Sequence, residues 1–181
     1  MLEIRWHGRG GQGAVTSVEL LALAAIGEGK FAQGFPSFGP ERRGAPVAAF
    51  NRVDDRRIKA RSGIYHPDVV VVLDEGLVGV INVTEGLKPE GTLIICTSKT
   101  RAAIKKALAY RGRLGTLNGL AIARQELGVA IVNTTMLGAL IKATNVVEMD
   151  AMRGPVEHRF GRIAQKNLAA MRRAYEEVEI N

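Results

Sequence analysis

The first 26 residues constrain the fold more than any other part of the sequence. Apolar and polar residues alternate over residues 2–7, a glycine-rich stretch follows, and residues 14–26 carry apolar side chains at helical spacing. This order predicts a strand, a tight turn and a helix. Gly8, Gly10 and Gly13 form a Gly-x-Gly-x-x-Gly pattern, which in this context presents backbone N–H groups and a helix N-terminus to a phosphate.

The glycine-rich stretch is therefore a candidate anion site. Glycine has no Cβ atom, so the backbone can approach a ligand closely. Arg9 adds a guanidinium group that can form two parallel hydrogen bonds with a phosphate. The alternative is a turn that serves only to pack the strand against the helix. The candidate binding residues of this stretch are Gly8, Arg9, Gly10, Gly11, Gln12 and Gly13.

A dinucleotide site is the obvious interpretation of such a loop, but one requirement is missing. Proteins that bind NAD in this way need an Asp or Glu about 20 residues beyond the loop, at the end of the second strand, to bind the ribose. The region holds Gln33, Gly34 and Phe35 instead, and Glu28 lies in the turn that ends the helix. Because this acid is missing, a free-standing NAD(P)-binding enzyme is only the second hypothesis.

Strands and helices alternate along the rest of the chain. We expect strands at 68–73 and 92–96, a short apolar stretch at 113–117, and helical segments at 75–83, 99–109, 118–127, 134–144 and 162–177. Residues 31–40, with two prolines and two glycines, are expected to form a loop, and the runs 46–53 and 57–61 to form a hairpin. Together these elements predict an α/β fold, a three-layer α/β/α sandwich with a mostly parallel, Rossmann-like sheet and an antiparallel hairpin, in a single domain of residues 1–181.

Composition limits the chemistry that the chain can carry alone. Cys96 is the only cysteine, so the chain cannot bind a four-thiolate iron–sulfur cluster or a cysteine-only zinc ion, and its apolar neighbours predict a buried thiol. His7, His66 and His158 lack the close spacing of metal ligands, so we expect no metal site. Of the three, His7 is placed to reach a ligand at the glycine-rich stretch, although a structural role is the alternative.

The formal net charge of +7 indicates an anionic partner. A nucleic-acid-binding module is the third hypothesis, but the basic residues are scattered from Arg5 to Arg173 and no DNA-binding motif is present. The longest aliphatic run, residues 69–73, is far shorter than the roughly 20 residues of a membrane-spanning helix. The N-terminus shows no signal-peptide pattern. We expect a cytoplasmic protein that binds neither nucleic acid nor membrane.

Four polar residues are expected to act mainly in the fold. Asp74 and Glu75 follow a strand at the edge where α/β sheets bind ligands, yet helix capping is the preferred interpretation. Asn133 is a candidate N-cap of the helix that follows it. Asn167, in mid-helix, is expected to make a buried or intersubunit hydrogen bond.

Two motifs give the sequence a family resemblance. The first is Gly8-Arg9-Gly10-Gly11-Gln12-Gly13 before an alanine- and leucine-rich helix, and the second is Phe38-Gly39-Pro40-Glu41-Arg42-Arg43-Gly44 before a strand. This sequence strongly resembles the gamma subunits of pyruvate or 2-oxoacid:ferredoxin oxidoreductases. The resemblance continues through Arg57-Ile58, the strand end at Asp74, Asn133, Leu137-Gly138 and Asn167. One departure is Ala45, which stands where the family usually has a second glycine.

The resemblance implies a noncatalytic subunit of an enzyme complex. Such enzymes convert a 2-oxo acid and coenzyme A into acyl-CoA and CO2 and pass electrons to ferredoxin, with thiamine diphosphate and [4Fe–4S] clusters on the alpha, beta and delta subunits. The gamma chain would support assembly and contact coenzyme A through the glycine-rich stretch and through Arg42, Arg43 and Gly44. Arg42 and Arg43 have two alternatives: to close the entrance to the partner's thiamine site, or to form an ordinary solvated or intersubunit charge pair. Pyruvate, 2-oxoglutarate, branched-chain 2-oxo acids and indolepyruvate all remain open as substrates.

Overall fold

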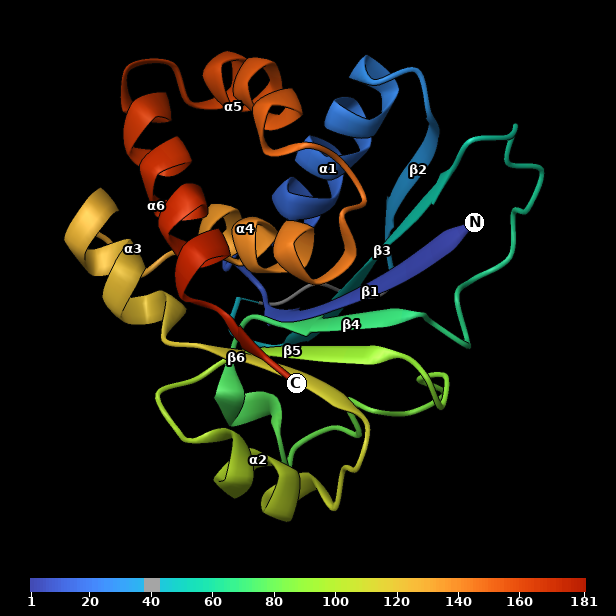
Figure 1. The fold of residues 1–181 in the computed structure, drawn as a ribbon, viewed down its shortest axis with the longest axis vertical. Helices are drawn as coiled ribbons and strands as arrows, with labels where there is room; N and C mark the ends of the chain where they lie inside the picture. Colours follow the sequence, from blue (N-terminus) through green and yellow to red (C-terminus); the bar gives the residue numbers. More distant parts are fainter. Residues whose placement is uncertain (38–42) are drawn as a thin grey trace.

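A computed structural model describes residues 1–37 and 43–181, which are arranged around one seven-stranded sheet (Figure 1). The strand order is β2-β3-β1-β4-β5-β6-β7. The strands are β1 (Leu2–Arg9), β2 (Phe31–Pro36), β3 (Pro46–Asp54), β4 (Val69–Val72), β5 (Thr92–Cys96), β6 (Arg113–Leu117) and β7 (Glu179–Ile180). β1, β4, β5 and β6 are parallel, and β2 runs with them because it is antiparallel to β3, which is antiparallel to β1. β3 and β7 run the opposite way, so the prediction of a mostly parallel sheet is confirmed.

Helices cover both faces of this sheet. One face carries α1 (Ala14–Gly27), α3 (Gly119–Leu127), α4 (Asn133–Thr144), α5 (Arg153–Phe160) and α6 (Ala164–Glu177), together with the 3-10 turns η2 (Met149–Met152) and η3 (Gly161–Ile163) (Figure 1). The other carries α2 (Arg101–Leu108) and the 3-10 turn η1 (Glu75–Leu77). Each face has its own buried apolar cluster. The three-layer α/β/α sandwich is confirmed. Among the described residues, no helix combines the length and the apolar character needed to cross a bilayer.

Alternation along β1 places different chemistry on the two faces. Ile4 and Trp6 are fully buried in the larger apolar cluster, under α1. Trp6 Nε1 donates to Asn51 Oδ1 (3.0 Å), and Asn51 Nδ2 donates to the carbonyl O of Val18 (2.9 Å). These two buried bonds connect β1, β3 and α1, because a buried indole N–H or amide needs a partner. Successive side chains of a strand point to opposite faces, so Arg5 lies on the α2 face.

The loop predicted for residues 31–40 is wrong in its first part, because residues 31–36 form the edge strand β2. Proline is tolerated on an edge strand, and Pro36 is the last residue of this one. Gly34 has a packing role, since a Cβ atom there would lie 2.7 Å from Val18 Cγ1 of α1. Glycine and proline therefore indicate close packing and a sheet edge at this position, not irregular backbone.

The predicted hairpin of residues 46–53 with 57–61 is also wrong. β3 uses one edge to pair with β1 and the other to pair with β2, so neither edge is free for residues 57–61. The antiparallel hairpin is β2 with β3 instead. Side chains hold the segment that follows: Gln33 Nε2 donates to Ala60 O (3.2 Å) and Arg52 Nη2 donates to Gly63 O (3.2 Å).

Other predicted elements exist with different bounds. The helix expected at 75–83 is reduced to the single turn η1, and the chain then reaches Gly79 with a φ of +98°. Thr100 caps α2 and Asn118 caps α3 through their side chains. The prediction that Asn133 caps α4 is wrong, because Val132 occupies that position and no side chain caps the helix. The elements α5 and β7 were not predicted.

The helices α4 and α6 are in close backbone contact at Gly138. A Cβ atom there would overlap the carbonyl oxygen of Met171. Nearby, Thr134 Oγ1 donates to Asn167 Oδ1 (2.8 Å), and Asn167 Nδ2 donates to Ile163 O (2.9 Å). The expected buried hydrogen bond of Asn167 is confirmed, and it joins the same two helices.

We expect Gly138→Ala to lower the free energy of unfolding by about 2 to 3 kcal/mol, because the methyl group forces the α6 backbone away. Chemical denaturation followed by circular dichroism measures this change. Gly154→Ala in α5 is the matched control, since nothing lies within 4 Å of its added Cβ atom. The control should unfold at the same or a slightly higher denaturant concentration. Equal stability of both variants would contradict this account of the packing.

We expect the thiol of Cys96 to be inert in the folded protein. Cys96 is 2% exposed, and burial raises the pKa of its thiol to about 11. At pH 8 roughly one thiol in a thousand would be ionised, and the thiolate is the reactive form. A thiol reagent such as DTNB should therefore label one group per chain after unfolding in guanidinium and almost none before it. Rapid labelling of the native protein would show that this strand is more open than described.

Candidate functional site

The carboxyl ends of the parallel strands bring the two sequence motifs together. β1 leads into the glycine-rich loop, which we define as residues 8–13. Gly10 N donates to Ala45 O (2.9 Å), Gly44 N donates to Gly10 O (3.1 Å), and Gly10 also forms a bridge with Arg43. Gly44 and exposed Arg43 therefore lie directly beside the loop, although they are more than 30 positions away in sequence. Arg42 lies outside the described residues.

The glycines of the loop give the backbone a conformation that other residues rarely adopt. Gly11 has a φ of +93° and Gly13 a φ of +82°. A Cβ atom on Gly13 would also lie 2.6 Å from Asn133 Nδ2, and one on Gly8 would lie 3.2 Å from Leu73 Cδ1. The dihedral angles therefore favour glycine at positions 11 and 13, and the contacts leave little room for a side chain at positions 8 and 13.

The N-terminus of α1 is available to an anion. Gly13 is its N-cap residue, and none of the described side chains accepts a hydrogen bond from the first turn. The first N–H groups of a helix lack partners within the helix and carry partial positive charge. Asn133 lies against Gly13 and begins α4, a second helix without a side-chain cap. Two helix N-termini thus meet at the loop. From the sequence, Asn133 was expected to cap a helix, and its contact with the loop was missed. The family resemblance, which includes Asn133, was the one signal that could have pointed to it.

Arg9 is held in place by contacts within the chain. Its Nε donates to Asp74 Oδ2 (2.8 Å), Nη1 to Gly44 O (3.2 Å) and Nη2 to Gly76 O (3.3 Å). Three of its five N–H donors are used in this way, and the side chain is 31% exposed. A hydrogen bond within the loop joins its two halves, since Arg9 N donates to Gln12 Oε1 (2.7 Å). Arg9 therefore joins the loop to its surroundings and keeps two donors for a ligand.

Asp74 is the acceptor on which this arrangement converges. Burial alone would raise the pKa of its carboxyl group, but hydrogen bonds from Gln12, from the Gly76 N–H and from Arg9 outweigh burial and lower the pKa. Asp74 also caps η1, because its Oδ1 accepts from Gly76 N (2.8 Å). The prediction of a capping role is confirmed, and the link to the loop is an additional role that the sequence did not reveal.

A cavity of about 180 Å³ adjoins the loop at the ends of β4, β5 and β6. Its walls combine oxygen-rich side chains with apolar ones, namely Gln12, Leu73, Asp74, Glu75, Cys96, Thr97, Ser98, Asn118, Leu120, Ala130 and Val132. Glu75 accepts a hydrogen bond from the Thr97 hydroxyl and lies 3.6 Å from Lys99 Nζ. Over residues 1–37 and 43–181, no three His, Cys, Asp or Glu side chains cluster in a way that would hold a metal ion.

His7 does not belong to the loop site. Trp6 faces α1, so the next side chain points to the α2 face, where His7 is 8% exposed. Burial and the nearby Arg5 lower the pKa of His7 to about 4, which leaves the imidazole neutral at physiological pH. The alternative of a buried structural histidine therefore describes it better than contact with a ligand at the loop.

Comparisons with known proteins extend over nearly the whole chain. A family model described as pyruvate ferredoxin/flavodoxin oxidoreductase matches residues 3–177. The common gamma subunit of the pyruvate/ketoisovalerate oxidoreductases of Pyrococcus furiosus is 46% identical, with 99% of this chain and 98% of the relative covered. Pyruvate synthase subunit PorC of Methanothermobacter thermautotrophicus is 48% identical, with 99% and 97% covered.

Solved structures give the same result. The crystal structure of pyruvate oxidoreductase subunit PORC from Thermotoga maritima matches with a TM-score of 0.90 and 40% identity, over 99% of this chain and 98% of that one. A 2-oxoglutarate:ferredoxin oxidoreductase from Magnetococcus marinus shares the fold, with a TM-score of 0.71 and 20% identity over 97% of this chain and 30% of that one. The chain thus belongs to the pyruvate ferredoxin/flavodoxin oxidoreductase family, and its relatives include proteins named as the gamma or PorC subunit of such enzymes.

Proposed function

We propose that this chain is the gamma subunit of a 2-oxoacid:ferredoxin oxidoreductase, an enzyme that forms acyl-CoA and CO2 from a 2-oxo acid and coenzyme A. The support is family membership together with matches to gamma subunits over almost the full length of both partners. We propose that residues 1–181 act as one domain and that the chain has no catalytic residue of its own. Pyruvate is the favoured substrate of the complex, because the names of relatives at 40–48% identity include it.

The loop site is proposed to hold the phosphate groups of coenzyme A. The observation that carries this proposal is the uncapped N-terminus of α1, which follows a glycine with a φ of +82° beside the exposed Arg43. Backbone N–H groups at a helix N-terminus and a nearby guanidinium group suit a pyrophosphate or a ribose phosphate. The Magnetococcus marinus enzyme was solved with coenzyme A and succinyl-CoA bound, which is consistent with this choice of ligand.

The residues around the loop would have different tasks. Arg9 and Gln12 would fix the loop, since both donate to Asp74 and so reduce the repulsion that a free carboxylate would exert on a phosphate. Exposed Arg43, which forms no ion pair with another described residue, would supply charge to the ligand, and Arg42 precedes it in the sequence. Gly44 would support this position by its backbone bond to Gly10.

The remaining chemistry is assigned to partner subunits. Cys96 cannot supply the four thiolates of a [4Fe–4S] cluster. We propose that alpha, beta and delta subunits carry the clusters and thiamine diphosphate, and that electrons reach ferredoxin through them. The gamma chain would contribute the coenzyme A contact and support assembly.

The alternative of an NAD(P)-binding enzyme has less support. In a dinucleotide-binding fold the strand beside the glycine loop on the β2 side is parallel to β1 and ends in the acid that binds the ribose. Here β3 occupies that place and is antiparallel, so it ends at the opposite edge of the sheet. Asp74, at the end of the parallel neighbour β4, is already occupied by Arg9 and Gln12. Among residues 1–37 and 43–181, the requirements for ribose binding are therefore not met at this loop.

Purification of the tagged chain from its natural host tests the subunit assignment. We expect larger chains that contain iron–sulfur clusters to co-purify with it, and 2-oxo acid oxidation with that mixture. The isolated chain should show no turnover, because it lacks the redox groups. A protein that remains a monomer in the host, or that binds NAD(P) at micromolar concentration but not coenzyme A, would contradict the assignment.

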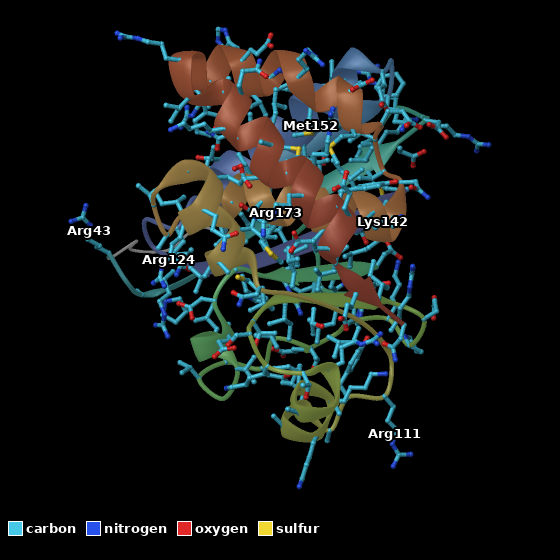
Figure 2. All side chains as sticks on the ribbon, turned by 60° about the vertical axis from the view of Figure 1, so that its left-hand side comes forward. Arg43, Arg111, Arg124, Lys142, Met152 and Arg173 are labelled. Carbon is cyan, nitrogen blue, oxygen red and sulfur yellow. The ribbon has the colours of Figure 1, made fainter. Side chains whose placement is uncertain are left out.

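Arg43→Gln is expected to raise the apparent KM for coenzyme A of the assembled enzyme roughly tenfold, the equivalent of one charge-assisted hydrogen bond. The turnover number at saturating coenzyme A should stay unchanged, because the side chain would contact a remote phosphate. Arg111→Gln is the control, since Figure 2 shows Arg111 extending from the opposite end of the molecule to Arg43. Identical KM values for the two variants would remove Arg43 from the coenzyme site while leaving the subunit assignment intact.

A further inference from the structure

The α2 face of the sheet lacks a helix over β1, β3 and β2. The connection from β3 to β4, residues 55–68, is a long loop without a helix (Figure 1). Between this loop and the strands lies a cavity of about 730 Å³. That volume is within the range of roughly 300–1,000 Å³ that small-molecule sites occupy. The loop thus leaves room for a ligand where a helix of the usual α/β architecture would fill the space.

The floor of the cavity is a row of three side chains across three strands. Arg5 of β1 is the register partner of Phe50 of β3, which is the register partner of Phe35 of β2. Register partners point to the same face of a sheet. The rings of Phe35 and Phe50 stack with their centroids 5.4 Å apart. The floor therefore combines two stacked aromatic rings, with the Arg52 guanidinium over the Phe35 ring and the Arg5 guanidinium at the other end of the row.

The roof of the cavity is fixed to the floor. Arg52 Nη2 donates to Gly63 O (3.2 Å), and Arg5 Nη2 donates to Glu85 O (2.5 Å). A Cβ atom on Gly86 would overlap the carbonyl oxygen of Tyr65, so these two backbone segments are in direct contact. The walls also include the apolar Ile64 and Pro36. The cavity is preformed, which lowers the entropic cost of binding a ligand.

Arg5 has unused hydrogen-bonding capacity at this place. Its Nη2 donates to Val83 O (3.2 Å) and Glu85 O, Nε is buried without a partner among the described residues, and Nη1 makes no hydrogen bond to those residues. The residue is only 8% exposed. Burial lowers the pKa of Arg5 and the charge of Glu85 raises it, but a guanidinium group keeps its proton at neutral pH. Because Arg5 lines the cavity, an anionic acceptor in it would receive a charge-assisted hydrogen bond from Nη1.

Aromatic and charged side chains complete the rim. Tyr65 is 73% exposed although it lines the cavity, so its ring can cover a ligand that rests on the two phenylalanines. The exposed Arg61 lies on the rim as a second cation, and His66 and Glu85 also line the cavity. Two arginines against one carboxylate leave a small positive excess, which suits a single negative charge better than a polyphosphate.

We propose that this cavity binds a small carboxylate with a planar aromatic or branched aliphatic body. The carboxylate would pair with the Arg5 guanidinium, and the apolar body would lie between Phe50 and Tyr65. The site is separate from the loop, because Arg5 precedes Arg9 by four strand residues, or roughly 13 Å, and faces the side of the sheet opposite α1. The proposal therefore does not depend on coenzyme A.

NMR titration of the isotope-labelled full chain tests this site. The probes are 3-phenylpropionate and 4-methylpentanoate, each compared with its uncharged amide. We expect both acids to shift the amide signals of Phe35, Phe50 and Tyr65 and to bind roughly tenfold more tightly than the amides, the value of one charge-assisted hydrogen bond. Signals of the glycine-rich loop should not move, which distinguishes this site from the coenzyme site.

Variants of exposed residues separate the parts of the site without risk to the core. Tyr65→Ala should weaken the binding of 3-phenylpropionate and of its amide equally, by about fivefold, because it removes one aromatic contact. Arg61→Gln should weaken binding of the acid but not of the amide, and Arg111→Gln should leave the affinity for both unchanged. Equal binding of acid and amide, shifts that map elsewhere, or no binding of either acid at millimolar concentration would each overturn the proposal.

Discussion

The carboxylate of Asp74 joins the chain segments that meet at the carboxyl edge of the sheet. It accepts hydrogen bonds from Arg9 Nε, from Gln12 Nε2 and from Gly76 N. A partly buried carboxylate is stable only when it is paired and hydrogen-bonded, and these three donors meet that need. Because Arg9 also donates to Gly44 O, hydrogen bonds connect the glycine-rich loop, the residues just before β3 and the turn after β4. These contacts position the N-terminus of α1, which has no cap from a described side chain.

The second constraint is the antiparallel strand β3, which lies between β1 and β2. It ends at the edge opposite the glycine-rich loop, so the end of this strand cannot supply a ribose-binding acid beside that loop. It also changes the next connection: the chain leaves β3 at the far edge, where β4 begins, and needs no helix to return. The same strand therefore accounts for the absence of a dinucleotide site and for the cavity above Phe50. A parallel strand in this place would have needed a long crossover connection, which in α/β proteins is usually a helix packed on the sheet.

Sequence reasoning succeeded where a segment forms its structure mainly through its own periodicity. The strand–loop–helix of residues 2–26, the aliphatic strands β4 and β5 and the amphipathic α6 all lie close to their predicted positions. It failed where tertiary contacts outweigh local signals. Gly34 and Pro36 suggested a loop but belong to an edge strand against α1, and residues 57–61 alternate like a strand but find no free edge. Residues 75–83 have helical spacing, yet the turn ends after Leu77.

The sequence by itself determined the glycine-rich turn, the single buried thiol and the membership of the family, because each depends on residue types at short and ordered spacings. Only the tertiary structure decided which groups meet. Arg9 faces Asp74 across 65 positions, Arg43 lies beside Gly10, and Arg5 shares a row with Phe50 and Phe35. The physical reason is that helix and strand formation follow from neighbouring residues, whereas these contacts follow from strand order and register. Order and register are set by burial summed over the whole sheet, which no single segment encodes.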